Sequence, residues 1–212
     1  ILADDYLKKW KDNSASLFPP DFLNDSDSLM LEVMRIDDHS PDGKKNPVLV
    51  KEKQMHKDLQ PLLKHFPNIK HVFCNAVTDL PTEEDHNYRN YYKSFKRTIN
   101  KHAERIEKYR SNHPNHKLIF LVMDETSGVY FAKCNDRSGK IHLVFFDNRF
   151  VSEFIDKDID YLILYMPYNY FTISSPHVPL LHLVVYDVKN LRQGNMMQYY
   201  DYDESNIISS ES

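Results

Sequence analysis

The clearest pattern of apolar and polar positions along the chain is that of one long helix. From about Glu83 to Asn112, apolar residues recur in alternating steps of three and four. This spacing predicts an amphipathic helix of about eight turns. Thr82 is the expected N-cap, and Asn112-His113-Pro114 is the expected end. The apolar stripe comprises Tyr88, Tyr92, Phe95, Ile99, Ala103, Ile106 and Tyr109.

Short apolar runs bounded by polar residues predict the strands. They are Ser28–Ile36, Ile69–Val77, Leu118–Met123, Val129–Ala132, Ile141–Phe146, Tyr161–Met166 and Leu181–Val185, with a shorter one at Val48–Val50. Further helices are expected over residues 3–17, Gln54–Phe66 and Val151–Asp156. We therefore predict a single α/β domain over residues 1–212. Helices flank its mixed central sheet, which is parallel in part with an antiparallel second half. The tail over about 195–212 is either an acidic extension or a segment ordered by its tyrosines.

The composition excludes several classes of function. The chain has 212 residues and a net charge of −4, so no strong overall field selects a partner. Its four glycines do not form GxxxxGK[ST] or GxGxxG. The apolar strand that ends in Asp124-Glu125 therefore lacks the phosphate loop of an ATPase, and a dinucleotide site is equally disfavoured.

No feature of the sequence predicts a membrane protein or a zinc protein. No apolar run approaches the roughly 18 residues of a membrane span, and no leader peptide is visible, so we expect a cytoplasmic protein. Cys74 and Cys134 lie in separate apolar runs and are expected to be buried free thiols. The chain has eleven histidines, but His113-x-x-His116 has no neighbouring ligand to complete a zinc set, so we expect scattered surface or core histidines.

Two carboxylates at the start of the chain suggest chemistry. Pro20-Asp21 is followed by Glu32, which lies inside the strand SLMLEVM. Carboxylates on adjacent strands can hold Mg²⁺, which prefers oxygen ligands. The string Pro20-Asp21-x10-Glu32-x-Met34 resembles the PD-(D/E)XK nuclease superfamily. The resemblance implies an αβββαβ core over roughly residues 3–77 and metal-dependent phosphodiester cleavage, with Asp21 and Glu32 as metal ligands and catalytic residues.

The chain departs from this family at its lysine. Met34 stands where the family has the lysine that stabilises charge. The neighbouring Arg35 would point to the opposite face of the strand. A lysine of the following segment could replace it, and we take Lys51 as the candidate catalytic residue, with Lys44, Lys45 and Lys53 as alternatives. An inactive relative that only binds nucleic acid is the other interpretation.

The long helix carries a basic ridge. Its side chains from Arg89 to Arg110 include eight Lys or Arg and two Glu, a net charge of +6, so the rest of the chain sums to −10. Basic side chains spaced four residues apart form a ridge along one face of a helix, which is typical of phosphate binding. Nucleic acid is the partner that this ridge predicts. A solvated helix face is the alternative. The ridge comprises Arg89, Lys93, Arg97, Lys101 and Arg105.

Acidic residues after apolar runs and a high tyrosine content also bear on function. Asp37, Asp38, Asp124, Glu125 and Asp147 each follow an apolar run, where ligands gather in open α/β sheets, although strands also end simply where polar loops begin. The many tyrosines support a second hypothesis, a non-catalytic interaction or regulatory domain with a tyrosine-rich surface. They are Tyr88, Tyr91, Tyr92, Tyr161, Tyr165, Tyr168, Tyr170, Tyr199, Tyr200 and Tyr202.

Overall fold

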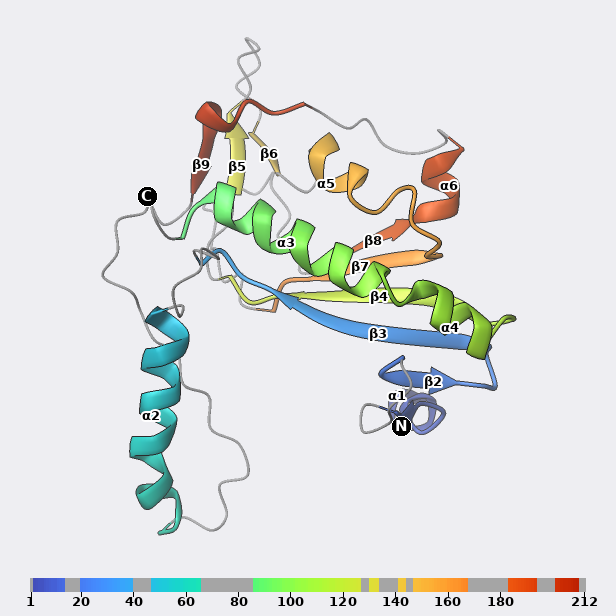
Figure 1. Cartoon of the computed structure of the whole chain (residues 1–212), viewed down its shortest axis with the longest axis horizontal. Coiled ribbons are helices and arrows are strands. Elements are labelled where there is room, and N and C mark those ends of the chain that lie inside the picture. Colours follow the sequence, from blue (N-terminus) through green and yellow to red (C-terminus); the bar gives the residue numbers. More distant parts are fainter. Residues whose placement is uncertain are drawn as a thin grey trace.

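The centre of the fold is a six-stranded sheet with the strand order β1-β2-β3-β4-β7-β8 (Figure 1). The computed structural model describes residues 2–13, 20–39, 47–65, 86–126, 130–133, 141–143, 147–167, 183–193 and 201–209. The strands are β1 (Lys11–Asp12), β2 (Phe22–Asn24), β3 (Leu29–Ile36), β4 (Lys117–Asp124), β7 (Tyr161–Tyr165) and β8 (Leu183–Asp187).

The sheet is parallel at its centre and antiparallel on both sides. β1, β2 and β3 form an antiparallel meander, whereas β3, β4 and β7 are parallel and β8 returns antiparallel to β7. The register of β3 and β4 pairs Glu32 with Phe120 and Ile36 with Asp124. The carboxyl ends of β3 and β4 therefore meet at the same edge of the sheet.

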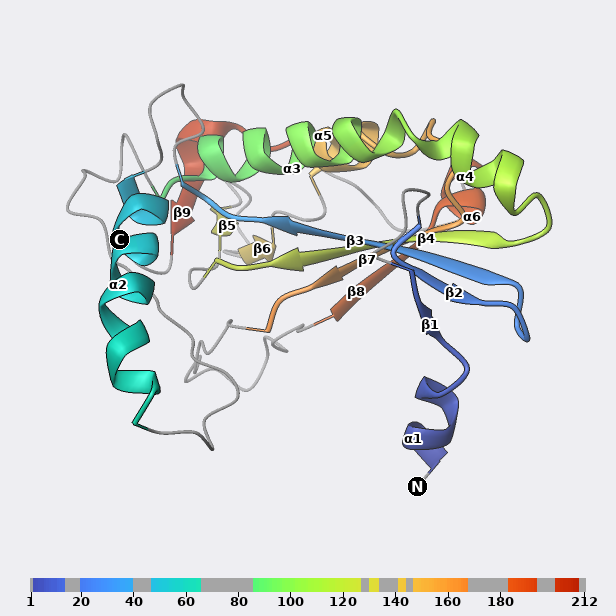
Figure 2. The ribbon, with the colours of Figure 1, turned by 60° about the horizontal axis from the view of Figure 1, so that its bottom comes forward.

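Four of the described helices cover one face of this sheet (Figure 2). They are α3 (Tyr88–Ala103), α4 (Ile106–Asn112), α5 (Asn148–Ser152) and α6 (Val188–Arg192). Helices α1 (Leu2–Leu7) and α2 (Pro47–Leu63) lie away from this layer. The core between helices and sheet comprises Met30, Met34, Ile36, Tyr91, Phe95, Ile99, Leu118, Phe120, Val122, Phe150, Phe154, Leu162 and Leu164, among others.

The central strands alternate between a buried and a less buried face. In β3, Met30, Glu32, Met34 and Ile36 are buried beneath the helices, while the residues between them are half-buried or exposed. β4 and β7 alternate in the same way. This alternation is that of a strand with one dominant core face. Glu32 therefore lies on the core side.

A second, three-stranded sheet brings the end of the chain back to its middle. Its order is β6-β5-β9, and both pairings are antiparallel. β5 is Tyr130–Lys133, β6 is Ile141–Leu143 and β9 is Ile207–Ser209, which the short helix η2 (Glu204–Asn206) precedes. Strand pairing thus joins residues 207–209 to the middle of the chain.

The structure confirms the predicted fold class, a mixed α/β sheet with a long amphipathic helix, and corrects several boundaries. The helix predicted over 3–17 ends at Leu7, and the chain from Lys11 enters β1. The predicted strand Val48–Val50 is wrong, because α2 begins at Pro47. Proline at the first helical position has its backbone angle already set for a helix. The predicted strand over 69–77, Cys74 and Cys134 lie outside the described residues. No described helix has the length and apolar character of a membrane span.

The long helix begins later than predicted and bends once. Its first residue is Tyr88, and Asn87 rather than Thr82 is the N-cap, since the Asn87 side chain accepts a hydrogen bond from the Asn90 N–H. Between α3 and α4 the Arg105 N–H pairs with the His102 carbonyl, three residues back, at 3.1 Å. This tightened turn bends the helix.

Candidate functional site

α3 runs antiparallel along β3, and side chains of the helix and of the residue before its N-cap meet one polar residue in the strand and two just beyond its end. His102 meets Glu32, Ser94 meets Asp37, and His86, just before the helix, meets Asp38. The strand therefore carries one polar cluster under the end of α3 and another at its own carboxyl end. The first contains the metal ligands predicted from the sequence.

The structure brings Asp21 and Glu32 together. β2 pairs with β3 so that Phe22 lies opposite Leu31, which puts Asp21 at the position across from Glu32. Asp21 Oδ2 accepts a hydrogen bond of 2.8 Å from the Val33 N–H. Burial raises the pKa of Asp21, and the negative charge of Glu32 adds to this effect, while the Val33 N–H, His102 and Arg105 oppose it.

Glu32 is buried beside an imidazole, a guanidinium and a hydroxyl group. Only 2% of it is exposed, and its Oε1 lies 2.6 Å from His102 Nδ1 and 4.0 Å from Arg105 Nη1. Its Oε2 is also buried and has no hydrogen-bond partner among the described residues. The Tyr109 hydroxyl lies close by, and burial together with the charge of Glu32 raises its pKa. The bend between α3 and α4 brings His102, Arg105 and Tyr109 to this one carboxylate.

The positively charged group beside the carboxylates is an arginine, not the predicted lysine. Met34, at the family's lysine position, is buried in the core. Lys51 is exposed on α2, which lies beyond the carboxyl end of β3 (Figures 1 and 2), whereas Glu32 is in the middle of that strand. Arg35 points outward, as expected, and pairs with Glu125 at 3.3 Å. The structure therefore does not bring Lys51 together with Asp21 and Glu32.

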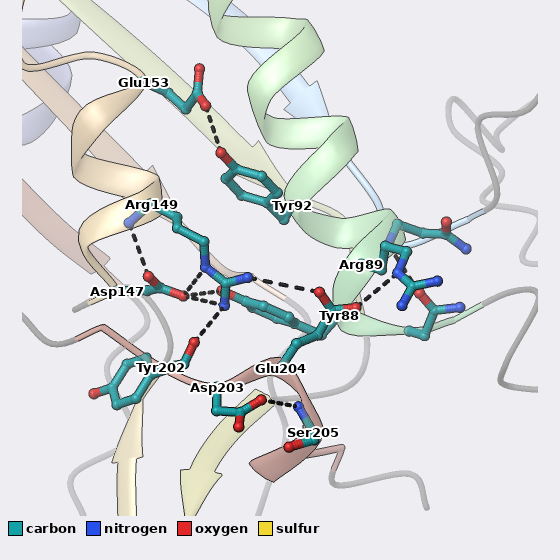
Figure 3. Close-up of polar contacts among 12 residues, drawn as sticks. Tyr88, Arg89, Tyr92, Asp147, Arg149, Glu153, Tyr202, Asp203, Glu204 and Ser205 are labelled. Carbon is teal, nitrogen blue, oxygen red and sulfur yellow. Dashed lines mark hydrogen bonds and ion pairs between the residues drawn. The ribbon is translucent and has the colours of Figure 1, made fainter.

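All five members of the basic ridge are exposed on α3 and at its end. Arg89 forms an ion pair of 2.8 Å with Glu204, which Figure 3 shows at the start of the helix. Arg105 lies near Glu32. Burial raises the pKa of Asp37, and the positive charge of Arg97 opposes that effect. The ridge is thus a charged, solvent-facing surface that ends at the Asp21–Glu32 pair.

The strand-end carboxylates form a separate group. Asp124 lies beside Ile36, four positions along the strand from Glu32, or about 13 Å at 3.3 Å per residue. Asp124 therefore does not join Glu32, and neither does Glu125, which is exposed. Asp124 is buried, and it accepts hydrogen bonds from the Tyr91 hydroxyl and from the N–H and hydroxyl of Thr126. Burial raises its pKa to about 6.

Asp147 anchors a network that connects three parts of the chain (Figure 3). The Tyr88 hydroxyl of α3 and the Arg149 guanidinium of α5 both donate hydrogen bonds to this buried carboxylate. Arg149 also donates to the Tyr202 carbonyl at 3.3 Å. The start of α3 is therefore fixed by contacts to α5 and to the segment before β9.

The second cluster contains two histidines that the sequence analysis overlooked. Asp38 is 3% exposed and accepts hydrogen bonds from the Tyr130 hydroxyl at 2.6 Å and from His86 Nδ1 at 3.0 Å. Burial alone would raise the pKa of Asp38, but these bonds and the two histidines, His39 and His86, hold it below its ordinary value. Asp37-Asp38-His39 directly after an apolar strand was the available signal; His86, far along the sequence, gave none.

Most of the described tyrosines of the second hypothesis belong to the interior or are half-buried. Tyr88 and Tyr91 are buried, and Tyr92 is half-buried and donates a hydrogen bond to Glu153. Tyr161 and Tyr202 are half-buried, and Tyr165 is 38% exposed. Tyr168, Tyr170, Tyr199 and Tyr200 lie outside the described residues. The helix tyrosines thus serve as core residues and as donors to buried carboxylates.

Comparison with known proteins does not assign this arrangement to a family. The chain matches no protein-family model, and no significant similarity to a curated protein or to a solved structure was found.

Proposed function

We propose that the chain is a nuclease-like protein that binds nucleic acid along α3 and cleaves a phosphodiester with Mg²⁺ held by Asp21 and Glu32. The observation that carries the proposal is the position of Asp21 across from Glu32, beneath His102 and Arg105. Two carboxylates on neighbouring strands beside a cation are the groups that such a reaction needs.

The order of the elements supports this proposal. Among the described elements, α1, β1, β2 and β3 are followed by α2, then by α3 and α4, which form one bent helix, and then by β4. The first three strands form an antiparallel meander and β4 joins β3 in parallel. With α3 and α4 counted as one bent helix and α2 as an insertion, this is an αβββαβ order, but it extends over residues 2–124 rather than the 3–77 that the resemblance to the PD-(D/E)XK superfamily implies.

The donor set fits a hard divalent ion. Asp21 and Glu32 offer carboxylate oxygens, and the buried Oε2 of Glu32 has no hydrogen-bond partner among the described residues. Mg²⁺ would lower the pKa of a bound water and stabilise charge on the phosphoryl group. Arg105 takes the place of the missing lysine as the stabiliser of developing negative charge. His102 holds the Glu32 carboxylate in position through its 2.6 Å contact.

The ridge supplies affinity without sequence preference. Lys93, Arg97 and Lys101 are exposed between the Arg89–Glu204 ion pair and Arg105. Lys and Arg side chains that neutralise phosphates release counterions from the nucleic acid. The logarithm of the binding constant therefore falls linearly with the logarithm of the salt concentration. A backbone bound along these residues reaches Arg105 and the carboxylate pair.

Calorimetry with Mg²⁺ and Mn²⁺, followed by a plasmid-cleavage assay, tests the proposal. The wild type should bind one Mg²⁺ ion and nick DNA, and Glu32→Gln should lose both properties while it keeps its fold. The matched control is Asp25→Asn, because Asp25 is an exposed carboxylate in the turn that joins β2 to β3 and pairs with Lys11. Equal ion binding by wild type and Glu32→Gln would contradict the metal site.

Two outcomes separate the alternatives. Nucleic-acid binding without ion binding or cleavage would identify the inactive relative, in which the His102–Glu32 pair replaces the metal. Absence of nucleic-acid binding at low salt would remove the nuclease-like proposal altogether. The hypothesis of a tyrosine-rich interaction surface has lost much of its support, because Tyr88 and Tyr91 are buried.

A further inference from the structure

We propose that Asp38, His39 and His86 form a second metal site, specific for a divalent transition-metal ion such as Zn²⁺ and separate from the Asp21–Glu32 pair. Each of the three offers one ligand atom, and these atoms all lie within 4.8 Å of one another. It is the only group of three or more such side chains with this geometry in the described parts of the chain.

The spacing of the three side chains suits one small ion. Ligand atoms that bind zinc tetrahedrally at 2.0–2.2 Å lie about 3.4 Å from each other. The three ligand atoms, all within 4.8 Å of one another, would therefore have to approach each other by at most about 1.4 Å, which side-chain rotation supplies. The imidazole rings of His39 and His86 already meet edge to face, with their centroids 4.4 Å apart.

The backbone explains how consecutive residues can converge. Within a strand, Asp38 and His39 would point to opposite faces. β3 ends at Ile36, so both residues lie in the irregular chain beyond it and can face the same point. His86 reaches that point from the other side, immediately before the N-cap Asn87, with a left-handed φ of 50°. The end of a central strand and the start of the longest covering helix thus hold the group from two sides.

The surroundings support the ligands. The Tyr130 hydroxyl donates a hydrogen bond of 2.6 Å to Asp38 Oδ2, which fixes the carboxylate from the second sheet. Contacts of this kind orient metal ligands and raise the affinity of a site. Asp38 is buried, and His39 and His86 are half-buried, so the group is sheltered without being sealed from solvent.

The ligand types select the class of ion. Two imidazoles and one carboxylate suit Zn²⁺ and Fe²⁺, whereas Mg²⁺ prefers oxygen ligands throughout. Three protein ligands leave a coordination position open for water or substrate, as in catalytic rather than structural zinc sites. The carboxyl end of parallel strands is also where α/β sheets place their ligands. Asp38 lies six positions along the chain from Glu32, or roughly 20 Å at 3.3 Å per residue, so the two sites are distinct.

Zinc titration tests this site. The full chain is first freed of metal with a chelator, and its zinc binding is then measured by competition with a chromophoric chelator. Wild type should bind one equivalent of Zn²⁺, and His86→Ala and His39→Gln should each bind it at least tenfold more weakly. The matched control is His113→Ala. His113 and His116 also meet edge to face, 5.2 Å apart, and His116 contacts Asp25, but these three do not form a ligand group.

The outcomes decide the site independently of the nuclease proposal. Zn²⁺ binding should be unchanged in Glu32→Gln and should persist in excess Mg²⁺. If His86→Ala does not fold, His39→Gln tests the site instead. Zinc should raise the melting temperature of the wild type but not that of His39→Gln. Equal zinc binding, or an equal rise in melting temperature, in wild type and His39→Gln would overturn the site. So would a wild type that binds no zinc.

Discussion

Replacing Asp124 by asparagine should remove one pH-dependent contribution to folding stability. Asp124 is 2% exposed, and burial raises its pKa from 3.8 to about 6. The folded chain therefore binds this proton more tightly than the unfolded chain does. The contribution of Asp124 to the stability of the wild type therefore falls as the pH rises from about 4 to about 6, and it levels off above that range. Asparagine keeps the shape of the side chain and removes the charge.

The magnitude follows from the two pKa values. A shift of one unit corresponds to about 1.4 kcal/mol, so the full effect of the ionised carboxylate is about 3 kcal/mol. About 1 kcal/mol of it is already present at pH 4.5, which leaves about 2 kcal/mol between pH 4.5 and 7.5. The amide oxygen of the new asparagine can still accept from Thr126, and the Tyr91 hydroxyl can turn to accept from the amide nitrogen. The bonds that hold the site thus survive the substitution.

Urea denaturation of both proteins across this pH range measures the effect. The free energy of unfolding of Asp124→Asn, relative to wild type, should rise by about 2 kcal/mol from pH 4.5 to 7.5. Asp156→Asn, which removes one exposed carboxylate, is the control for the loss of charge. A difference that does not change with pH would refute the assignment of Asp124 as the buried acid with a raised pKa.

Three further changes test the other contacts. Tyr91→Phe removes the hydroxyl that donates a hydrogen bond of 2.7 Å to Asp124. The free energy of unfolding, measured by thermal or urea denaturation, should fall by about 1–3 kcal/mol. His102→Ala removes the 2.6 Å contact of the buried Glu32 and leaves the more distant Arg105, at 4.0 Å, beside it; the free energy of unfolding should fall by about 3 kcal/mol at neutral pH. Adding Glu32→Gln to it should restore part of that loss; a further full loss would show that the pair does not interact. The double variant Arg97→Ala/Lys101→Ala should make the slope of log K against log salt less negative by up to about 1.8 for duplex DNA. Lys53→Ala/Lys57→Ala, on the exposed face of α2, should leave that slope unchanged.

The sequence predicted the elements whose pattern was strong and local. β3, β4 and β7 are apolar runs with polar ends, and the stripe from Tyr88 to Tyr109 identifies the long helix. Errors arose where local preference was weak or was overridden. Val48–Val50 favours a strand by residue type, yet α2 already begins at Pro47. The acidic residues 83–85 resemble a first helical turn, but the helix begins at Tyr88 after the Asn87 cap.

The candidate sites depended on pairings that the sequence does not encode locally. Asp21 and Glu32 are close in sequence and joined by a hairpin, so their convergence could be predicted. Arg105 could not be identified as the neighbouring cation, because its position depends on the bend between α3 and α4 and on the packing of α3 over β3. The spacing of residues in the sequence does not show whether Lys51 or Arg105 is the cation beside the two carboxylates. Only the path of the helix places Arg105 there.

The same helix explains why both candidate sites belong to one strand. A helix advances about 1.5 Å per residue and a strand about 3.3 Å, so the stretch from His86 to His102 spans about 24 Å and that from Asp38 to Glu32 about 20 Å. The two lengths nearly match, and one histidine reaches a carboxylate at each end. Insertion of one alanine after Ile99 turns His102 away from Glu32, but Asn87 and Asp147 still fix the start of the helix. Calorimetry should therefore find weaker Mg²⁺ binding at Glu32 and unchanged Zn²⁺ binding at His86; an equal loss of both ions would show that the two ends of the helix are not held independently.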